Sequence, residues 1–139
     1  ALIFKVLKAA YLDKAVLSSL NLSQIDVLKY WELNIHLEKI GDRLKYIALI
    51  VPDVDKKLKK VFSNMILELE KLYLDCMVAF YKFSPHDATA VSIRRKKLIV
   101  DIKEEIEKNN CIICSRFAIN AFNMVHNIND IARIVRYLR

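Results

Sequence analysis

Hydrophobic residues recur along this chain at alternating spacings of three and four positions. Three such series stand out, on residues 33–51, 58–83 and 117–138. Their members are Leu33, Leu37, Ile40, Leu44, Ile47 and Val51; Leu58, Phe62, Met65, Leu69, Leu72, Cys76, Ala79 and Phe83; and Phe117, Ala121, Met124, Ile128, Ile131, Val135 and Leu138. A mean spacing of 3.5 residues keeps each series on one face of a long helix. We therefore predict long helices that pack at shallow angles, with these residues in the core.

Polar residues and prolines divide the chain into five predicted helices. Ser23 and Asp26 have the spacing of a capping box, and Pro52 and Pro85 mark further helix starts. The predicted helices are 1–20, 24–50, 53–82, 85–108 and 111–138. No capping residue precedes the apolar run that follows Ala1, so we expect the sequence to be a segment of a longer chain, entered in mid-helix. The prediction is an all-α, up-and-down bundle in one domain, 1–139.

Composition removes several other fold classes. The 139 residues include one Gly and two Pro, whereas 55% of them are hydrophobic. Sheets with several hairpins and Rossmann-type α/β folds need glycine in their turns, and phosphate-binding loops need glycine where backbone meets ligand. We also find no nucleophile–base pair and no long loop to hold a substrate, so the sequence favours a protein that is not an enzyme.

The net charge of +7 is compatible with binding to an acidic protein, to nucleic acid or to an anionic membrane surface. The charge alone does not favour one of these partners over the others. The basic clusters 56–60 and 94–97 are typical of solvated faces. No helix-turn-helix or zinc-finger spacing accompanies them, so we expect no sequence-specific DNA binding by this segment.

The longest uncharged stretch, 117–129, is too short to span a membrane, and we expect membrane contact only through a partner. An odd count of three Cys favours a reducing, cytoplasmic environment.

Two carboxylates interrupt a second apolar stripe in the predicted helix 24–50. The stripe is formed by Trp31, Ile35, Glu38, Asp42, Tyr46 and Leu49. Because Glu38 and Asp42 are four residues apart, they lie on one face of the helix. Desolvating a carboxylate is costly, so such a pair is expected to meet a cation, a basic side chain or an open groove.

The last predicted helix repeats this arrangement. At an offset of 88 residues, His126 and Asp130 fall on Glu38 and Asp42, within a stripe made by Ile119, Phe122, Ile134 and Tyr137. The same offset pairs the first predicted helix with the fourth and the second with the fifth. We therefore predict two three-helix units, of which the first, roughly 1–51, is incomplete and the second is roughly 52–139.

The run Glu38-Lys39-Ile40-Gly41-Asp42 resembles the E/D-R-I-G/A-D signature of the PhoU family, phosphate-signalling proteins built from two three-helix repeats. Residues 2–51 are similar to the archaeal-type members. The resemblance implies a homodimeric regulator of phosphate uptake. Such a regulator acts without catalysis, through contacts with a phosphate transporter or a signalling protein.

The resemblance also implies a possible iron or zinc site, because family members bind such clusters through E/D-x-x-x-D motifs. The matching residues are Glu38, Asp42 and Asp130; His126 occupies an acid position and remains a possible ligand. Asp101 fits the family spacing, but Lys97 stands where an acid is expected and is able to neutralise Asp101 or Asp130. A salt-bridged polar seam is therefore the main expectation, and a metal site is the alternative.

Three other functions remain open at this point. The chain fits the dimerisation or effector domain of a transcription regulator with an upstream DNA-binding segment, a metal-binding bundle, or a membrane-surface protein. Cys111 and Cys114 form a CxxC at a helix start, where the helix dipole favours a thiolate. Neither a second CxxC nor a βαβ context accompanies them, so we expect these cysteines to be structural.

Overall fold

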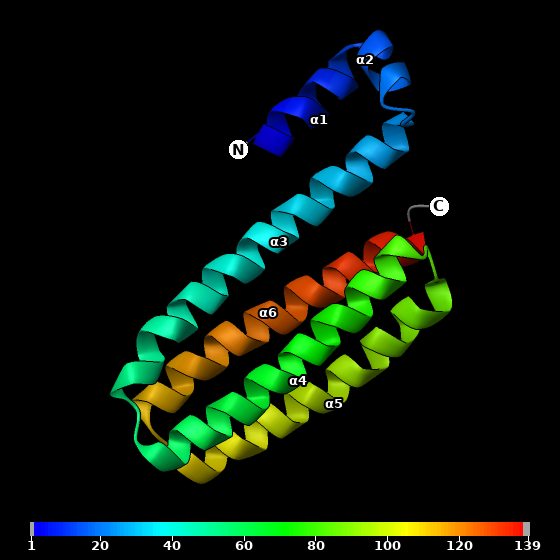
Figure 1. Ribbon diagram of the computed structural model, residues 1–139. Helices are drawn as coiled ribbons and strands as arrows, with labels where there is room; N and C mark the ends of the chain where they lie inside the picture. The colour runs from blue at the N-terminus through cyan, green and yellow to red at the C-terminus, as the bar shows by residue number, and fades with distance from the viewer. Residues whose placement is uncertain (1, 138–139) are drawn as a thin grey trace.

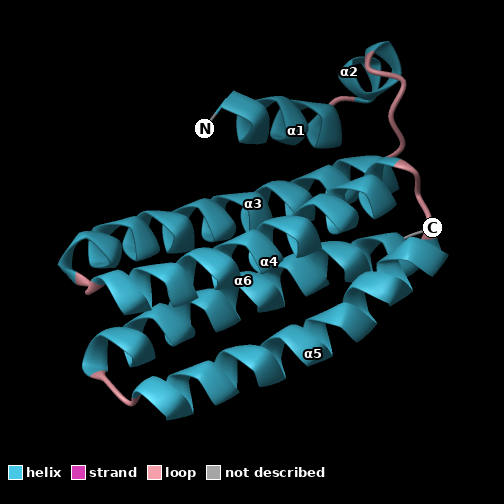
Figure 2. Ribbon diagram, turned by 60° about the horizontal axis from the view of Figure 1, so that its bottom comes forward, coloured by secondary structure: helices cyan, strands magenta, loops and turns pink. Residues whose placement is uncertain are grey.

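The computed structural model describes residues 2–137 and contains six α-helices and no strand in that range (Figures 1 and 2). The helices are α1 (Leu2–Leu12), α2 (Lys14–Ser19), α3 (Gln24–Ile50), α4 (Lys56–Tyr81), α5 (Pro85–Asn109) and α6 (Ile112–Tyr137), with a 3₁₀ turn η1 (Val51–Asp53). The predicted all-α bundle of long helices is confirmed.

The last described helix, α6, lies at the centre of the bundle. It packs against α3, α4 and α5, and α4 and α5 also pack against each other. α3 has its main contact with α6, and α1 folds back onto the outer side of α3 (Figure 1). The bundle is therefore a trio of α4, α5 and α6 with α3 laid along one side of α6.

Side-chain caps set the starts of three long helices, two of them at the residue that the sequence predicts. Ser23 and Asp26 form the predicted capping box at α3, and Ser84 accepts a hydrogen bond from the backbone of Asp87 at α5. α4 starts at Lys56 instead of the predicted residue 53, because Pro52 falls in η1 and Asp55 supplies the cap, accepting from the Leu58 amide at 2.9 Å.

The predicted first helix, 1–20, is two helices. Asp13 adopts an extended backbone conformation, and its carboxylate accepts a hydrogen bond from the amide of Ala15 at 2.8 Å. An aspartate can compete with helix propagation in this way because its short side chain caps the following turn. The prediction of one continuous helix was wrong at this residue.

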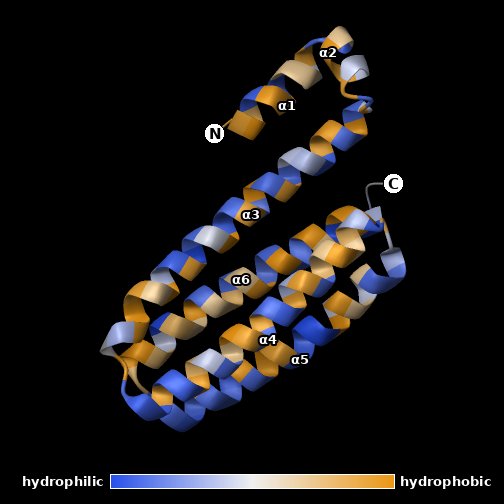
Figure 3. Ribbon diagram, in the orientation of Figure 1, coloured by the Kyte–Doolittle hydropathy of each residue, from blue (hydrophilic) through white to orange (hydrophobic). Residues whose placement is uncertain are grey.

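The core matches most of the predicted apolar series, and polar and apolar bands alternate along the long helices (Figure 3). Six of the seven residues predicted for α6 are buried; Leu138 lies outside the described residues. Two predicted core residues are exposed instead. Phe83 follows the end of α4 at a φ of 48°, and Leu44 lies at the edge of a groove described below.

A small second core joins α1 to α3. Leu7, Ala10 and Val27 are buried together, and the rings of Phe4 and Trp31 meet edge to face with centroids 5.0 Å apart. This contact covers the N-terminal part of the side of α3 that faces away from α6. The rest of that side of α3 is left to solvent.

Replacing Gly41 with alanine is expected to raise the free energy of unfolding by about 0.5–1 kcal/mol. Gly41 lies within α3, and a Cβ added there would meet no atom within 4 Å. The substitution therefore removes backbone freedom from the unfolded chain at no steric cost. Denaturant titration measures the effect, with Ala48→Gly at an exposed site of the same helix expected to destabilise by a similar amount. A destabilised Gly41→Ala variant would show that the glycine serves another purpose.

Candidate functional site

Glu38 and Asp42 lie in solvent, on the side of α3 that faces away from α6. Both are exposed, whereas Ile40 between them is buried. Each is two residues from Ile40, or about 200° around the helix, so the carboxylates and the core face lie on nearly opposite sides. The expectation of a salt-bridged polar seam at these acids was wrong, because α6 packs on the face of Leu33, Ile40 and Ile47 instead.

The other three predicted site residues are likewise separate. Asp101 on α5 and His126 on α6 are exposed, and Asp130 is partly exposed. Asp130 accepts a hydrogen bond from Arg133 at 3.3 Å, one helical turn away, and the structure gives it no ion pair with Lys97. Over residues 2–137, no three His, Cys, Asp or Glu side chains gather closely enough to hold a metal ion. The structure therefore does not assemble the predicted iron or zinc ligands into a centre.

Asp130 instead lines a shallow polar cavity between α3 and α6, with a volume of about 430 Å³. The lining residues are Glu32, His36, Asp130, Arg133, Ile134 and Tyr137. The ring of His36 is partly buried: Nδ1 lies 3.0 Å from Oδ1 of Asn127, and Nε2 lies 3.7 Å from Glu32. The spacing of Glu32 and His36, one turn apart, was the available signal. These contacts link two helices and contain no nucleophile.

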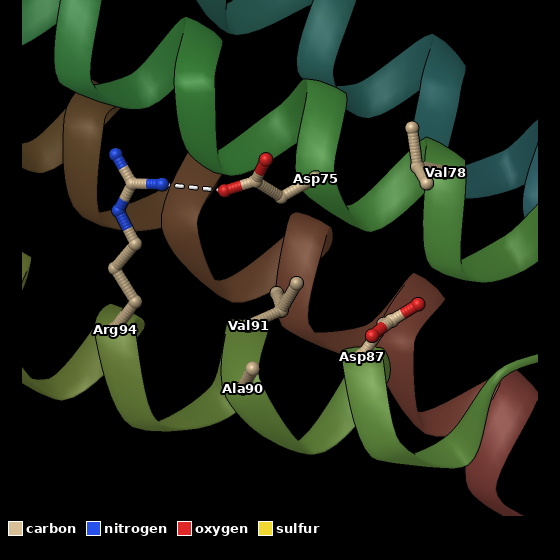
Figure 4. Close-up of a pocket in the computed structure, with 6 residues that line it drawn as sticks. All are labelled: Asp75, Val78, Asp87, Ala90, Val91 and Arg94. Atoms are coloured by element: carbon tan, nitrogen blue, oxygen red, sulfur yellow. Dashed lines mark hydrogen bonds and ion pairs between the residues drawn. The ribbon is translucent and has the colours of Figure 1, made fainter.

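A second polar pocket, of about 310 Å³, lies between α4 and α5 (Figure 4). In Figure 4 the guanidinium of Arg94 on α5 points across to Asp75 on α4, to which it donates a hydrogen bond. A second nitrogen of Arg94 lies 3.3 Å from Glu68, also on α4. Because two carboxylates already engage this guanidinium, the pocket offers little free positive charge to a phosphate.

Two carboxylates in this region, those of Glu68 and Asp87, are held in their charged form. Hydrogen bonds from Lys71, and then from Arg94, lower the pKa of Glu68. A hydrogen bond from Ser84 and one from His86 lower the pKa of Asp87, which also lines the pocket. Acids whose pKa is lowered are poor proton donors near neutral pH. This arrangement therefore ties α4 to α5 and does not resemble a general acid–base site.

A third cavity is an apolar groove between α3 and α4, with a volume of about 610 Å³. Met124 of α6 contributes to its lining, and Glu70 is the charged residue among those that line it. The groove residues are Leu37, Ile40, Gly41, Leu44, Ile66, Leu69, Glu70, Tyr73 and Met124. The groove exists because α3 packs chiefly against α6 and leaves the flank of α4 uncovered.

A line of exposed apolar side chains follows α4 on the side of the helix that faces away from the core. We call it the α4 ridge; its members are between 47% and 69% exposed, and they are Leu67, Leu74, Val78 and Tyr81. Their spacings of seven, four and three residues place them on one face of the helix. The ridge was not predicted from the sequence because a longer apolar series on α4 occupies the core. The regular spacing of Leu67, Leu74 and Tyr81 was the signal for it.

None of the described helices contains a stretch that is both long enough and apolar enough to cross a membrane. Comparison with known proteins returns no relative. No family model matches the chain, and no curated protein and no solved structure matches it.

Proposed function

We propose that this chain is a non-enzymatic, cytoplasmic regulator that acts through protein contacts, that it works as a homodimer, and that it regulates phosphate uptake. The observation that supports protein contacts is the α3–α4 groove together with the α4 ridge. The phosphate role rests on a different basis, the resemblance of residues 38–42 to the PhoU signature. The cytoplasmic location rests on the cysteine count.

The total exposed area of the molecule is large enough to accommodate a partner. The molecule exposes 8861 Å², whereas a compact monomer of 16.2 kDa is expected to expose about 7,500 Å². The excess, about 1,400 Å², exceeds the roughly 800 Å² that each partner buries in a standard interface. Large exposed apolar patches on a folded protein mark such interfaces.

A second copy of the chain is the partner that fits both surfaces at once. The groove and the ridge both involve α4, and a two-fold axis would bring the ridge of each copy to the groove of the other. The two contacts are then identical, and each buries leucine and tyrosine side chains that are otherwise in water. The interface would resemble a helix packed into an apolar groove.

The double variant Leu67→Glu, Leu74→Glu is expected to be monomeric, whereas the unaltered chain is expected to be a dimer. Four glutamates per dimer would otherwise be buried in an apolar contact, and like charges there cost several kcal/mol. Light scattering coupled to size-exclusion chromatography measures the mass. The matched control is Ile93→Glu, Val100→Glu, which alters two exposed apolar residues on α5, outside the groove and the ridge.

Three results would contradict the homodimer. They are a monomeric unaltered chain, a ridge variant that stays dimeric, and a control variant that dissociates as readily as the ridge variant. Circular dichroism of both variants shows whether the helices are retained, which keeps misfolding apart from loss of the interface.

The phosphate role is tested in a bacterial host that lacks its own regulator of phosphate uptake. We expect the chain to lower the uptake of radioactive phosphate when external phosphate is plentiful. The ridge variant is expected to lose this effect and the α5 control variant to keep it. Unchanged uptake with the dimeric, well-expressed chain would refute the phosphate role and leave the dimer in place.

A further inference from the structure

Two cysteines meet at the start of α6. Cys111 immediately precedes the helix and Cys114 lies in its first turn. The structure pairs them in a disulfide, with their Cα atoms 5.1 Å apart. The pairing is local, since two residues separate the cysteines in sequence.

A structural role explains this disulfide poorly. A cross-link stabilises a fold mainly by restricting the unfolded chain, and the gain falls as the closed loop shortens. The loop between Cys111 and Cys114 is among the shortest possible, and the turn it spans is already the first turn of a helix of 26 residues. The core around α6 is also well filled without it.

The two sulfurs differ in access. Cys114 is 1% exposed and belongs to the main core, whereas Cys111 is partly exposed. Ile112, the next residue after Cys111, is 81% exposed and gives an approaching molecule an apolar contact beside the disulfide. An incoming thiol or disulfide therefore reaches Cys111 first, and Cys114 is shielded from solvent.

The local backbone favours a thiolate on Cys111. The amide of Cys114 donates a hydrogen bond to Sγ of Cys111 at 3.1 Å, so the sulfur occupies the capping position of α6. Free amides and the helix dipole at an N-terminus stabilise negative charge. The third cysteine shows the opposite environment: Cys76 is buried in α4, burial raises its pKa to about 12, and its thiol donates to the carbonyl of Ile128.

We propose that Cys111 and Cys114 form a thiol–disulfide exchange centre that reacts with small disulfides of the glutathione type. The Cys111 thiolate attacks one sulfur of the disulfide, which forms a mixed disulfide and releases one thiolate. The Cys114 thiol then attacks Sγ of Cys111 and gives its proton to the second substrate thiolate as that thiolate departs. The intramolecular disulfide forms, so that the chain loses two electrons and the substrate gains them.

This centre is compatible with a reducing compartment, where disulfides in ordinary proteins are mostly transient and serve catalysis or redox sensing. It also differs from a thioredoxin-like site, where the cysteines follow a strand of a sheet. Here they follow the helix α5, and the amide donors belong to the start of α6. The proposal is independent of the dimer and of phosphate regulation.

Trapping experiments test the order in which the sulfurs of Cys111 and Cys114 react. The reduced chain is mixed with glutathione disulfide, quenched with an alkylating reagent and examined by mass spectrometry. We expect Cys114→Ser to accumulate a glutathione adduct on Cys111, and Cys111→Ser to form no adduct at Cys114. The matched control Cys76→Ser is expected to form the Cys111–Cys114 disulfide as the unaltered chain does. An unmodified Cys114→Ser variant, or an adduct on Cys76 in its place, would overturn the proposal.

Rate measurements separate the folded environment from ordinary thiol chemistry. At neutral pH, Cys111 in the folded Cys114→Ser variant is expected to react with glutathione disulfide roughly tenfold faster than in the same variant unfolded in urea. An equal or slower rate in the folded protein would show that the helix terminus does not activate the sulfur, and the proposed centre would be rejected.

Discussion

Replacing Phe117 with alanine is expected to lower the free energy of unfolding by about 3–5 kcal/mol. Phe117 is fully buried in α6, and its ring stacks on Phe62 of α4 with the centroids 4.0 Å apart and the planes 7° from parallel. The substitution removes the ring from the centre of the bundle, where three helices meet α6 and cannot easily move in to fill the space. Denaturant titration followed by circular dichroism measures the loss.

Ile119→Ala is the matched control for this prediction. Ile119 lies two residues from Phe117 on the same helix but is 59% exposed, so its truncation is expected to change the free energy by less than about 0.5 kcal/mol. Equal losses at the two positions would mean that α6 is not packed at the centre of the bundle as described.

Replacing Ile131 with aspartate is expected to unfold most of the protein at neutral pH. Ile131 is fully buried in α6, and an unpaired carboxylate there would cost more than about 4 kcal/mol, a large share of the stability of a domain of this size. The introduced carboxyl would have a folded-state pKa above its unfolded value of about 3.9. The charge penalty therefore grows as the pH rises above about 4 and is absent below that value.

The expected signature is thus helical content that decreases as the pH is raised, measured by circular dichroism between acidic and neutral pH. Ile119→Asp, at the exposed position on the same helix, is expected to keep its helical content throughout. An Ile131→Asp variant that stays folded at neutral pH with near-normal stability would contradict the burial of this face of α6.

Local signals predicted the helices well, because each depends on residues close in sequence. The Ser23–Asp26 box and Ser84 act within one turn of the helices they start, and the structure contains both caps. Asp13 shows the limit of this reasoning. An aspartate inside an apolar run is tolerated in many helices, and only the hydrogen bond to the Ala15 amide shows that this one starts a new helix.

The candidate site was harder to predict because α3 carries two apolar faces. One faces α6, and α1 covers only the first turns of the other. Periodicity identifies both faces but does not indicate which one a neighbouring helix covers. Glu38 and Asp42 were therefore expected to line a salt-bridged seam, whereas their face of α3 is open to water. The groove depends on the spacing between α3 and α4, which no sequence pattern encodes.

The central position of α6 also bears on how the protein is made. Residues 2–109 are synthesised before the helix around which α3, α4 and α5 pack. At typical elongation rates the 26 residues of α6 take roughly one to five seconds to appear. During that interval the apolar faces of α3, α4 and α5 that later contact α6 are uncovered, so nascent chains of this protein are expected to depend on chaperones until α6 emerges.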